Sequence, residues 1–276
     1  MRILLIDANH IFQTLYLSSG QGKSPDVNGF FTSCFGSVKR AIRSIQPTHV
    51  LFAMDDETSS FRRSINSSYK KDQFFLPIAY QNKLGLFCDN LKRNGISSMS
   101  TPGMEGKDII STICAKTNGV KSIKTFILSN SRRLFFLINE QTIVRDHFAK
   151  YKDEAEKTNS WLMDKFGVTP LQWNLSLILS GDNGVGIGGI SGIGQKTAIS
   201  IVKNCISEDD LANNLYSIEG KKGALIRAEF GHALLIYNNI VKLKENLELG
   251  ISLKDIRYPE LFLESLKEVN SLKLVT

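Results

Sequence analysis

The sequence predicts an α/β fold with a parallel sheet, followed by a smaller domain made only of helices. Three short apolar runs, at residues 2–6, 48–57 and 124–131, each end in polar residues, as buried strands do where they leave a sheet. Amphipathic helical stretches lie between these runs, an alternation typical of parallel sheets with helices on both faces. After a charged connector only helical patterns remain, so we expect domains at 1–160 and 161–276.

The individual stretches support this order. "FFTSCFGSVKRAIRSI" spaces its apolar residues by three and four, as a helix with one buried face does: Phe31, Phe35, Val38, Ile42 and Ile45. "IAYQNKLGLFCDNLKRNG" follows the same spacing and ends at a glycine. Residues 58–77 are polar, basic and aromatic, and we expect a loop or short helices there. In the second domain, "VTPLQWNLSLILSG" has a threonine cap and a first-turn proline, and "IGQKTAISIVKNC" forms one apolar stripe: Ala198, Ile201, Val202 and Cys205.

Composition excludes several classes of protein. The 276 residues are 42% hydrophobic and 22% charged, which suits a globular chain with a full core. The four cysteines are far apart and form no CxxC pair, which argues against a zinc site or a disulfide framework. No run approaches the ~18 apolar residues of a membrane span. We expect a soluble, cytoplasmic protein with no membrane partner, whose net charge of +7 favours a polyanion if basic residues lie beside a suitable motif.

The glycine-rich stretch "GDNGVGIGGISGIGQKTA", residues 181–198, is the strongest local signal. It contains a formal GxGxxG, but a helix precedes it and no βαβ unit follows, which excludes a dinucleotide fingerprint. A phosphate-binding P-loop requires Gly-Lys-Ser/Thr, and Gln195 interrupts that order. Two helices joined by a glycine hairpin fit better. Gly192 and Gly194 allow a tight turn, and Lys196 and Thr197 lie in the first turn of the second helix, which favours an anion such as a DNA backbone phosphate. A purely structural helical hairpin is the alternative.

The order of the motifs resembles a known family. "LLIDANHIF", "DDETSSFRR", "SYKK", "GMEGKD", "ILSNSRRL" and the glycine stretch occur as in bacterial and phage 5′-3′ exonucleases and flap endonucleases, and most resemble the short members of exonuclease IX type. The resemblance covers nearly the whole chain. It implies a PIN-like domain, a helix–three-turn–helix DNA-binding domain, and phosphodiester hydrolysis by two divalent metals held by many carboxylates.

Only part of the family's acidic set is present. The resemblance assigns metal ligands to five positions: Asp7, Asp55, Glu105, Asp108 and Asp182. At four further positions the family's acids are replaced: Lys107, Ser131, Arg133 and Val185. A unit charge ~4 Å from another unit charge is worth ~4 kcal/mol at an effective dielectric near 20, so Lys107 and Arg133 oppose a divalent ion. We expect at most one Mg²⁺ or Mn²⁺, and the resemblance also implies a K⁺ in the hairpin loop.

Two arrangements of these residues are open. In the first, Lys107 and Arg133 pair with the remaining carboxylates as fixed counterions. In the second, Lys107 points outward and one ion is held by four acids: Asp7, Asp55, Glu105 and Asp108. Each acid also has a structural alternative, such as capping of the next helix by Asp7.

The segment 61–71 keeps more of the family pattern. The resemblance gives Arg62 and Lys70 a catalytic and phosphate-binding role, and Tyr69 a face on which a base can stack. We therefore expect a monomeric protein that binds 5′-flap, branched or 5′-ended DNA, with two-metal hydrolysis lost or severely weakened. The alternatives are an active one-metal 5′-3′ exonuclease or flap endonuclease and, less favoured, a protein-interaction scaffold.

Overall fold

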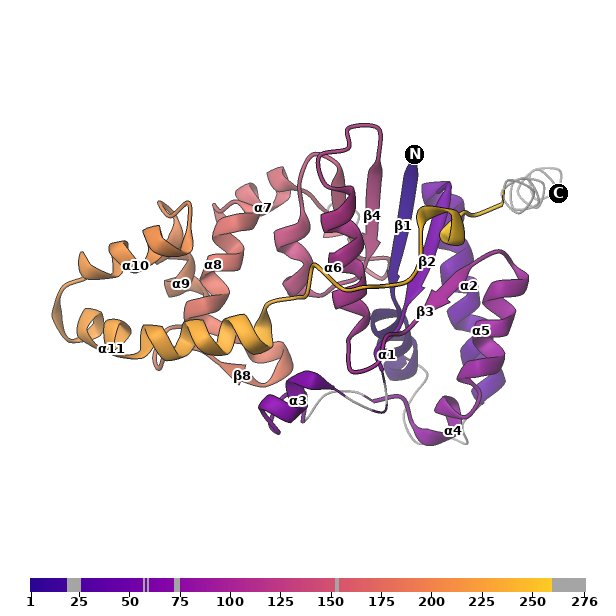
Figure 1. The fold of residues 1–276 in the computed structure, drawn as a ribbon, viewed down its shortest axis with the longest axis horizontal. Helices are drawn as coiled ribbons and strands as arrows, with labels where there is room; N and C mark the ends of the chain where they lie inside the picture. The colour runs from indigo at the N-terminus through magenta and orange to yellow at the C-terminus, as the bar shows by residue number, and fades with distance from the viewer. Residues whose placement is uncertain (19–25, 57, 59, 72–74, 152–153, 260–276) are drawn as a thin grey trace.

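The first half of the chain forms a six-stranded sheet with helices on both faces (Figure 1). The computed structural model describes residues 1–18, 26–56, 58, 60–71, 75–151 and 154–259. The strand order is β3-β2-β1-β4-β5-β6, in which the first five strands are parallel and β6 is antiparallel to β5. The strands are β1 (Arg2–Asp7), β2 (His49–Ala53), β3 (Ser97–Met99), β4 (Lys124–Leu128), β5 (Thr142–Arg145) and β6 (Glu156–Lys157). The predicted parallel α/β sheet is confirmed.

Alternate residues of the central strand β1 face two different cores. Leu4 and Ile6 are fully buried in the core beneath helices α1, α2 and α5. Ile3 and Leu5 are fully buried in the opposite core, which α6 and the C-terminal helices cover. The helices of the first half are α1 (Ala8–Ser18), α2 (Val27–Ile45), α3 (Phe61–Ile65), α4 (Ile78–Gln81), α5 (Leu84–Arg93), α6 (Gly106–Thr117) and the 3₁₀ helix η1 (Arg132–Leu137). A strand buried on both faces has a continuous apolar run, which is why "ILLI" was recognisable.

The C-terminal part is mostly helical. It comprises α7 (Asn159–Phe166), α8 (Pro170–Ser180), α9 (Gln195–Val202), α10 (Glu208–Tyr216), α11 (Gly220–Ile236), the π-helix η4 (Tyr237–Val241) and the 3₁₀ helix η5 (Leu253–Ile256). Helix α8 begins as predicted, with a capping box between Thr169 and Gln172 and a proline in its first turn. Between α8 and α9 a short antiparallel ladder, β7 (Gly181–Asp182) with β8 (Ile187–Gly188), flanks η3 (Asn183–Val185).

Several expectations need correction. Strands β3, β5 and β6 were missed because they are short, and the residues of β3 and β6 are largely polar. The C-terminal part is not wholly helical, because the β7–β8 ladder lies within it. On α9, Ile199 is buried and Ile201 is only partly buried, so the apolar stripe is Ala198, Ile199, Val202 and Cys205.

The chain returns to the sheet after η4, and the gold segment crosses α6 in the view of Figure 1. The Tyr258 amide donates to the Thr48 carbonyl at 2.9 Å, and the Ser97 hydroxyl donates to the Asp255 carbonyl at 2.6 Å. One apolar core runs from β1 through α8 and α9 to Ile256. The sheet and the C-terminal helices therefore share a core, and the boundary near residue 160 stays a prediction. Residues 260–276 of the second predicted domain lie outside the described part.

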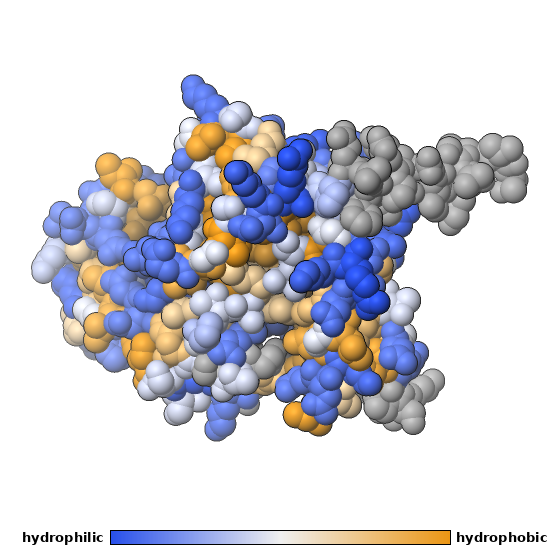
Figure 2. Space-filling view, turned by 45° about the vertical axis from the view of Figure 1, so that its right-hand side comes forward, coloured by the Kyte–Doolittle hydropathy of each residue, from blue (hydrophilic) through white to orange (hydrophobic). Residues whose placement is uncertain are grey.

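Within the described residues, the helices are either too short or too polar to cross a bilayer. Figure 2 shows hydrophilic and hydrophobic residues interspersed over one face of the molecule. The four cysteines are free thiols, and Cys34, Cys114 and Cys205 are buried.

Candidate functional site

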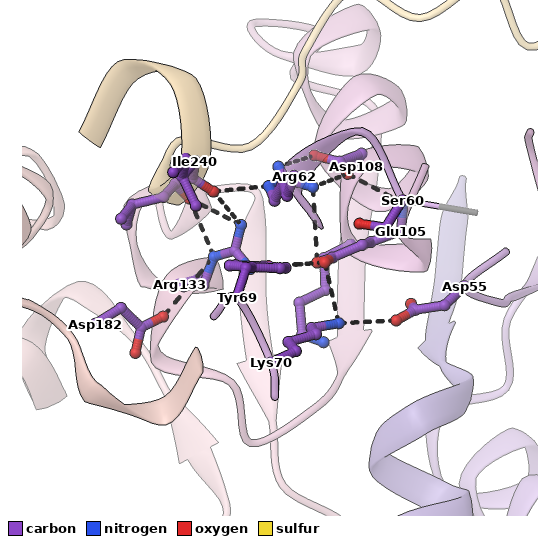
Figure 3. Close-up of polar contacts among 12 residues, drawn as sticks. Asp55, Ser60, Arg62, Tyr69, Lys70, Glu105, Asp108, Arg133, Asp182 and Ile240 are labelled. Carbon is purple, nitrogen blue, oxygen red and sulfur yellow. Dashed lines mark hydrogen bonds and ion pairs between the residues drawn. The ribbon is translucent and has the colours of Figure 1, made fainter. Parts of the chain in front are cut away.

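The family-pattern acids meet at one edge of the sheet. Asp7 is the last residue of β1, and Asp55 lies two residues beyond β2. Glu105 and Asp108 lie at the start of α6, where each carboxylate accepts a hydrogen bond from the backbone amide of the other in a capping box. Because the carboxyl ends of parallel strands share one edge, residues from distant parts of the chain converge there. Figure 3 shows the resulting cluster, which residues of η1 and η4 complete.

Arg62 and Asp108 form a buried bidentate ion pair at the centre of the cluster. The two guanidinium nitrogens lie 2.6 and 2.7 Å from the two Asp108 oxygens, and both side chains are fully buried. Asp108 also accepts from the backbone amides of Glu105 and Lys244, at 3.1 and 2.8 Å. The remaining Arg62 donors reach carbonyls that end the π-helix η4, including Ile240 at 2.7 Å. Asp108 therefore has every lone pair directed at a donor of this chain.

Arg133 makes a second bridge between the acids and η4. Its Nη1 donates to the Tyr69 hydroxyl at 2.7 Å and to Glu105 Oε2 at 3.2 Å. Its Nε and Nη2 donate to the Val241 carbonyl at 3.0 and 2.8 Å. Asp182 Oδ2 lies 3.9 Å from Nε. Burial works against the charge, but Tyr69, Glu105 and Asp182 raise the pKa of Arg133 further, so the guanidinium is permanently charged.

Lys70 fills the space between two carboxylates. Its Nζ lies 2.9 Å from Asp55 Oδ2 and 3.0 Å from Glu105 Oε1, while the Tyr69 hydroxyl donates to the same Glu105 oxygen at 2.7 Å. The Lys70 amide donates to the Val185 carbonyl at 2.9 Å, which ties the segment 61–71 to the glycine stretch. Burial works to lower the pKa of Lys70, but Asp55 and Glu105 outweigh it and the pKa is raised.

Asp7 faces Lys107. The Lys107 ammonium lies 3.5 Å from Asp7 Oδ2, which also accepts from the Ser129 hydroxyl at 2.7 Å. Burial works to raise the pKa of Asp7, but Lys107 and the Ser129 hydrogen bond outweigh it, so the pKa is lowered. Lys107 thus points into the cluster, which removes the condition under which Asp7, Asp55, Glu105 and Asp108 were expected to hold one ion.

The described residues do not fit a divalent-metal centre. Four cations pair with five carboxylates: Arg62, Lys70, Lys107 and Arg133 with Asp7, Asp55, Glu105, Asp108 and Asp182. Their formal charges sum to −1, so two divalent ions would leave the cluster at +3. Within the described residues, no group of three or more His, Cys, Asp or Glu side chains is arranged to hold a metal ion. The protein's own cations occupy the carboxylates.

The three residues of the segment 61–71 that were expected to face DNA lie inside the charged cluster, and their DNA-binding role stays a prediction. Arg62 and Tyr69 are fully buried and Lys70 is 7% exposed. Tyr69 offers no open face for a base, and the cationic heads of Arg62 and Lys70 are held by carboxylates. The physical reason is that buried carboxylates need counterions or hydrogen-bond donors, and these side chains supply them. Asp108 is likewise paired with Arg62, and its metal-ligand role stays a prediction.

The glycine hairpin presents a different surface. A methyl group on Gly189 would lie 2.2 Å from the Leu179 carbonyl oxygen, so this glycine allows the close packing of the loop. Gly192 has φ +75°, and open space surrounds it. Gly194 precedes α9, and Lys196 is exposed in the first turn, where backbone amides have no acceptor within the helix. Thr197 is half-buried beside it, and the Ser191 amide donates to Glu229 at 3.1 Å.

Sequence reasoning missed several members of the site. Ser129, Asn9 and the carbonyls at the end of η4 hold the charged side chains in place, with Asn9 donating to Asp55 at 2.6 Å. Asn9 lies within the motif "LLIDANHIF", so its place two residues after a strand-end acid was a usable signal. The η4 carbonyls carry no sequence signal, because a π-helical end depends on packing. Ser131 lines the cleft beside the cluster, and Val185 is buried.

Acid should weaken this fold through Glu105. Burial works to raise the pKa of Glu105, but Lys70, Arg133 and Arg62 outweigh it and hold the pKa far below its ordinary value of 4.5. A depressed folded-state pKa stabilises the fold above the ordinary value and less as pH falls below it. We expect the free energy of unfolding, from urea titrations at pH 3 to about 6, to decrease below about pH 4.5. The decrease should be shallower in Glu105→Gln and unchanged in the exposed control Glu140→Gln.

Comparison with known proteins gives consistent matches. The model of the family described as 5′-3′ exonuclease, N-terminal resolvase-like domain, matches residues 2–167. The chain is 30% identical over 259 residues to the flap endonuclease Xni of Shewanella sediminis, covering 93% of this chain and 97% of the relative. It is 26% identical over 264 residues to the protein of the same name from Tolumonas auensis, covering 93% and 97%.

Solved structures share the fold. The T5 5′-exonuclease with bound zinc ions superposes with a TM-score of 0.66 at 16% identity, covering 97% of each chain. A second match is the bacteriophage T5 D15 flap endonuclease, solved as a pseudo-enzyme–product complex with DNA and metal ions. That protein carries an aspartate-to-lysine substitution and gives a TM-score of 0.66 at 15% identity, covering 98% of this chain and 99% of the other. The predicted PIN-like fold is confirmed.

Proposed function

Because this chain belongs to the 5′-3′ exonuclease family, we propose that it is a family member that binds branched or 5′-ended DNA without two-metal hydrolysis. The observation that carries the proposal is the occupation of all five family-pattern carboxylates by cations of the chain itself. Two of these cations, Lys107 and Arg133, stand where the family has acids. The T5 pseudo-enzyme that is bound to DNA also has a lysine in place of an aspartate.

In this proposal the DNA contact is made by the helical hairpin of the C-terminal part. The start of α9 is exposed at Gly192, Gly194 and Lys196. A methyl group placed on either glycine would have no other heavy atom within 4 Å, so the backbone there is open to solvent. A duplex backbone can therefore approach the helix amides closely. The segment 61–71 then acts from the interior, by holding the carboxylates and the end of η4.

The test uses 5′-flap DNA in two measurements. We expect binding by fluorescence anisotropy, and cleavage with Mg²⁺ or Mn²⁺ far below the roughly 1 s⁻¹ of ordinary enzymes. Turnover near that rate would refute the loss of hydrolysis. If the protein binds no DNA, the DNA-binding role is refuted as well.

Lys196→Glu should weaken binding to duplex DNA at low salt by about tenfold or more, since it reverses a charge beside the backbone phosphates. Affinity of the unaltered protein should fall steeply between about 50 and 200 mM salt, with a smaller slope in the variant. Lys92→Glu on α5 is the matched control, because Lys92 is equally exposed and lies on another helix. An equal loss in both variants would show that the hairpin is not the contact.

A second candidate function is an active flap endonuclease that uses one metal. The names of the relatives favour it, as does Asp7 Oδ1, which is buried and has no hydrogen-bond partner within the described residues. Asp7→Asn separates the two candidates. Metal-dependent cleavage of flap DNA that disappears in Asp7→Asn supports the enzyme, whereas equally weak cleavage in both proteins supports the metal-free proposal.

A further inference from the structure

A cleft of about 420 Å³ opens beside the charged cluster, between the end of β1 and the glycine stretch. This volume lies within the roughly 300–1,000 Å³ of small-ligand pockets. Its wall contains four cations and two carboxylates: Lys70, Lys107, Arg132 and Arg133 with Asp7 and Asp182. Three further acids of the cluster, Asp55, Glu105 and Asp108, are not among the residues that line this cleft, and they form ion pairs with Lys70, Arg133 and Arg62. The surface of the cleft therefore favours an anion.

Two of the wall cations are available to a ligand. Arg132 is exposed, and within the described part of the chain it forms no ion pair. Lys107 has one ion-pair contact, with Asp7 at 3.5 Å, which is longer than a hydrogen bond of good geometry. Lys70 and Arg133, in contrast, are held at 3.2 Å or less by carboxylates. An incoming phosphate would thus meet Lys107 and Arg132.

The rest of the wall can hydrogen-bond to a nucleotide. The side-chain amides of Gln13, Asn130 and Asn183 line the cleft, and none of the three forms a hydrogen bond within the described residues. Asp7 Oδ1 is buried without a partner there and needs a donor. A ligand that combines a phosphate with a hydroxyl or amino group satisfies both requirements, and one terminal nucleotide has that chemistry.

We infer that this cleft binds the 5′-phosphorylated terminal nucleotide of a DNA strand, with its phosphate monoester on Lys107 and Arg132. The inference rests on the proposed function and specifies which DNA end the protein prefers, namely one that carries a 5′-phosphate. A terminal phosphate carries about −1.5 to −2 charge at pH 7, whereas a 5′-hydroxyl end carries none at that position. Lys107, which stands where the family has an acid, thus supplies one of the two cations of the end-phosphate site.

The experiment compares two DNA duplexes with single-stranded 5′ overhangs that differ only in a 5′-phosphate or a 5′-hydroxyl. We expect the protein to bind the phosphorylated end about tenfold more tightly, the size of one good charge-assisted contact. Lys107→Ala and Arg132→Ala should each reduce this preference to about threefold or less. Arg132 is exposed, so its removal leaves the core intact, and Lys92→Ala on α5 is the charge-matched control that should keep the full preference.

Binding of the hydroxyl duplex separates this inference from the proposed function. Equal affinity for both ends, with DNA binding intact, overturns the end-phosphate site and leaves the proposed function standing. Absence of binding to either duplex overturns both. A second arm titrates a free deoxynucleoside 5′-monophosphate by calorimetry. If it binds in a Lys107-dependent manner while the two DNA ends bind alike, the cleft takes a free nucleotide and the inference is wrong.

Discussion

Arg62→Ala is expected to lower the free energy of unfolding by about 3–5 kcal/mol, because it leaves the Asp108 carboxylate buried without its counterion. Both side chains of the pair are fully buried, and two guanidinium–carboxylate bonds of 2.6 and 2.7 Å are lost together. The carbonyls of Ile240 and Lys242 also lose their donor, at 2.7 and 3.0 Å. Urea denaturation followed by tryptophan fluorescence measures the change.

Two further variants test that cause. Arg62→Met combined with Asp108→Leu should be less destabilised than either single variant, because a matched apolar pair leaves no buried charge. Lys165→Met removes an exposed ion pair with Glu154 and should change the urea midpoint little. If Arg62→Ala behaves like Lys165→Met, the buried pair does not stabilise the fold and the description of the cluster as a charged core fails.

The fold was predictable where each element carried its own signal. The run "RILLID" and the spacing in α2 are local patterns, and the capping box of α8 lies within residues 169–172. Strands β3 and β6 carry no such pattern, because Ser97–Met99 and Glu156–Lys157 extend a sheet edge through backbone hydrogen bonds. The return of the chain from η4 to β2 also has no local signal.

The sequence predicted which charged residues meet at the site better than it predicted the direction in which their side chains point. The family pattern indicated which positions converge, and it left open whether Lys107 points inward or outward. Orientation depends on charge balance across segments far apart in sequence, such as Arg62 with Asp108 and Arg133 with the η4 carbonyls. Tyr69 and Lys70 were placed on a DNA-facing surface because motifs report residue types rather than exposure.

Mg²⁺ is expected to leave the unfolding of this protein unchanged and to stabilise a variant in which both intruding cations are reversed, Lys107→Asp with Arg133→Asp. The two substitutions add two carboxylates and remove two cations from the cluster, a change of −4 in formal charge. Without metal, this variant should unfold at a lower urea concentration than the unaltered protein, since its carboxylates then repel one another. At a free Mg²⁺ concentration 100 times the dissociation constant, ion binding would raise the free energy of unfolding of this variant by about 2.7 kcal/mol.

Lys92→Asp with Arg93→Asp is the matched control, because both residues are exposed on α5 and the charge change is the same. Its unfolding should not respond to Mg²⁺. A Mg²⁺-dependent gain in the unaltered protein would mean that its acids bind metal despite Lys107 and Arg133, and the metal-free proposal would fall. If Mg²⁺ stabilises only the variant with Lys107→Asp and Arg133→Asp, then Lys107 and Arg133 are the side chains that prevent metal binding in the unaltered protein.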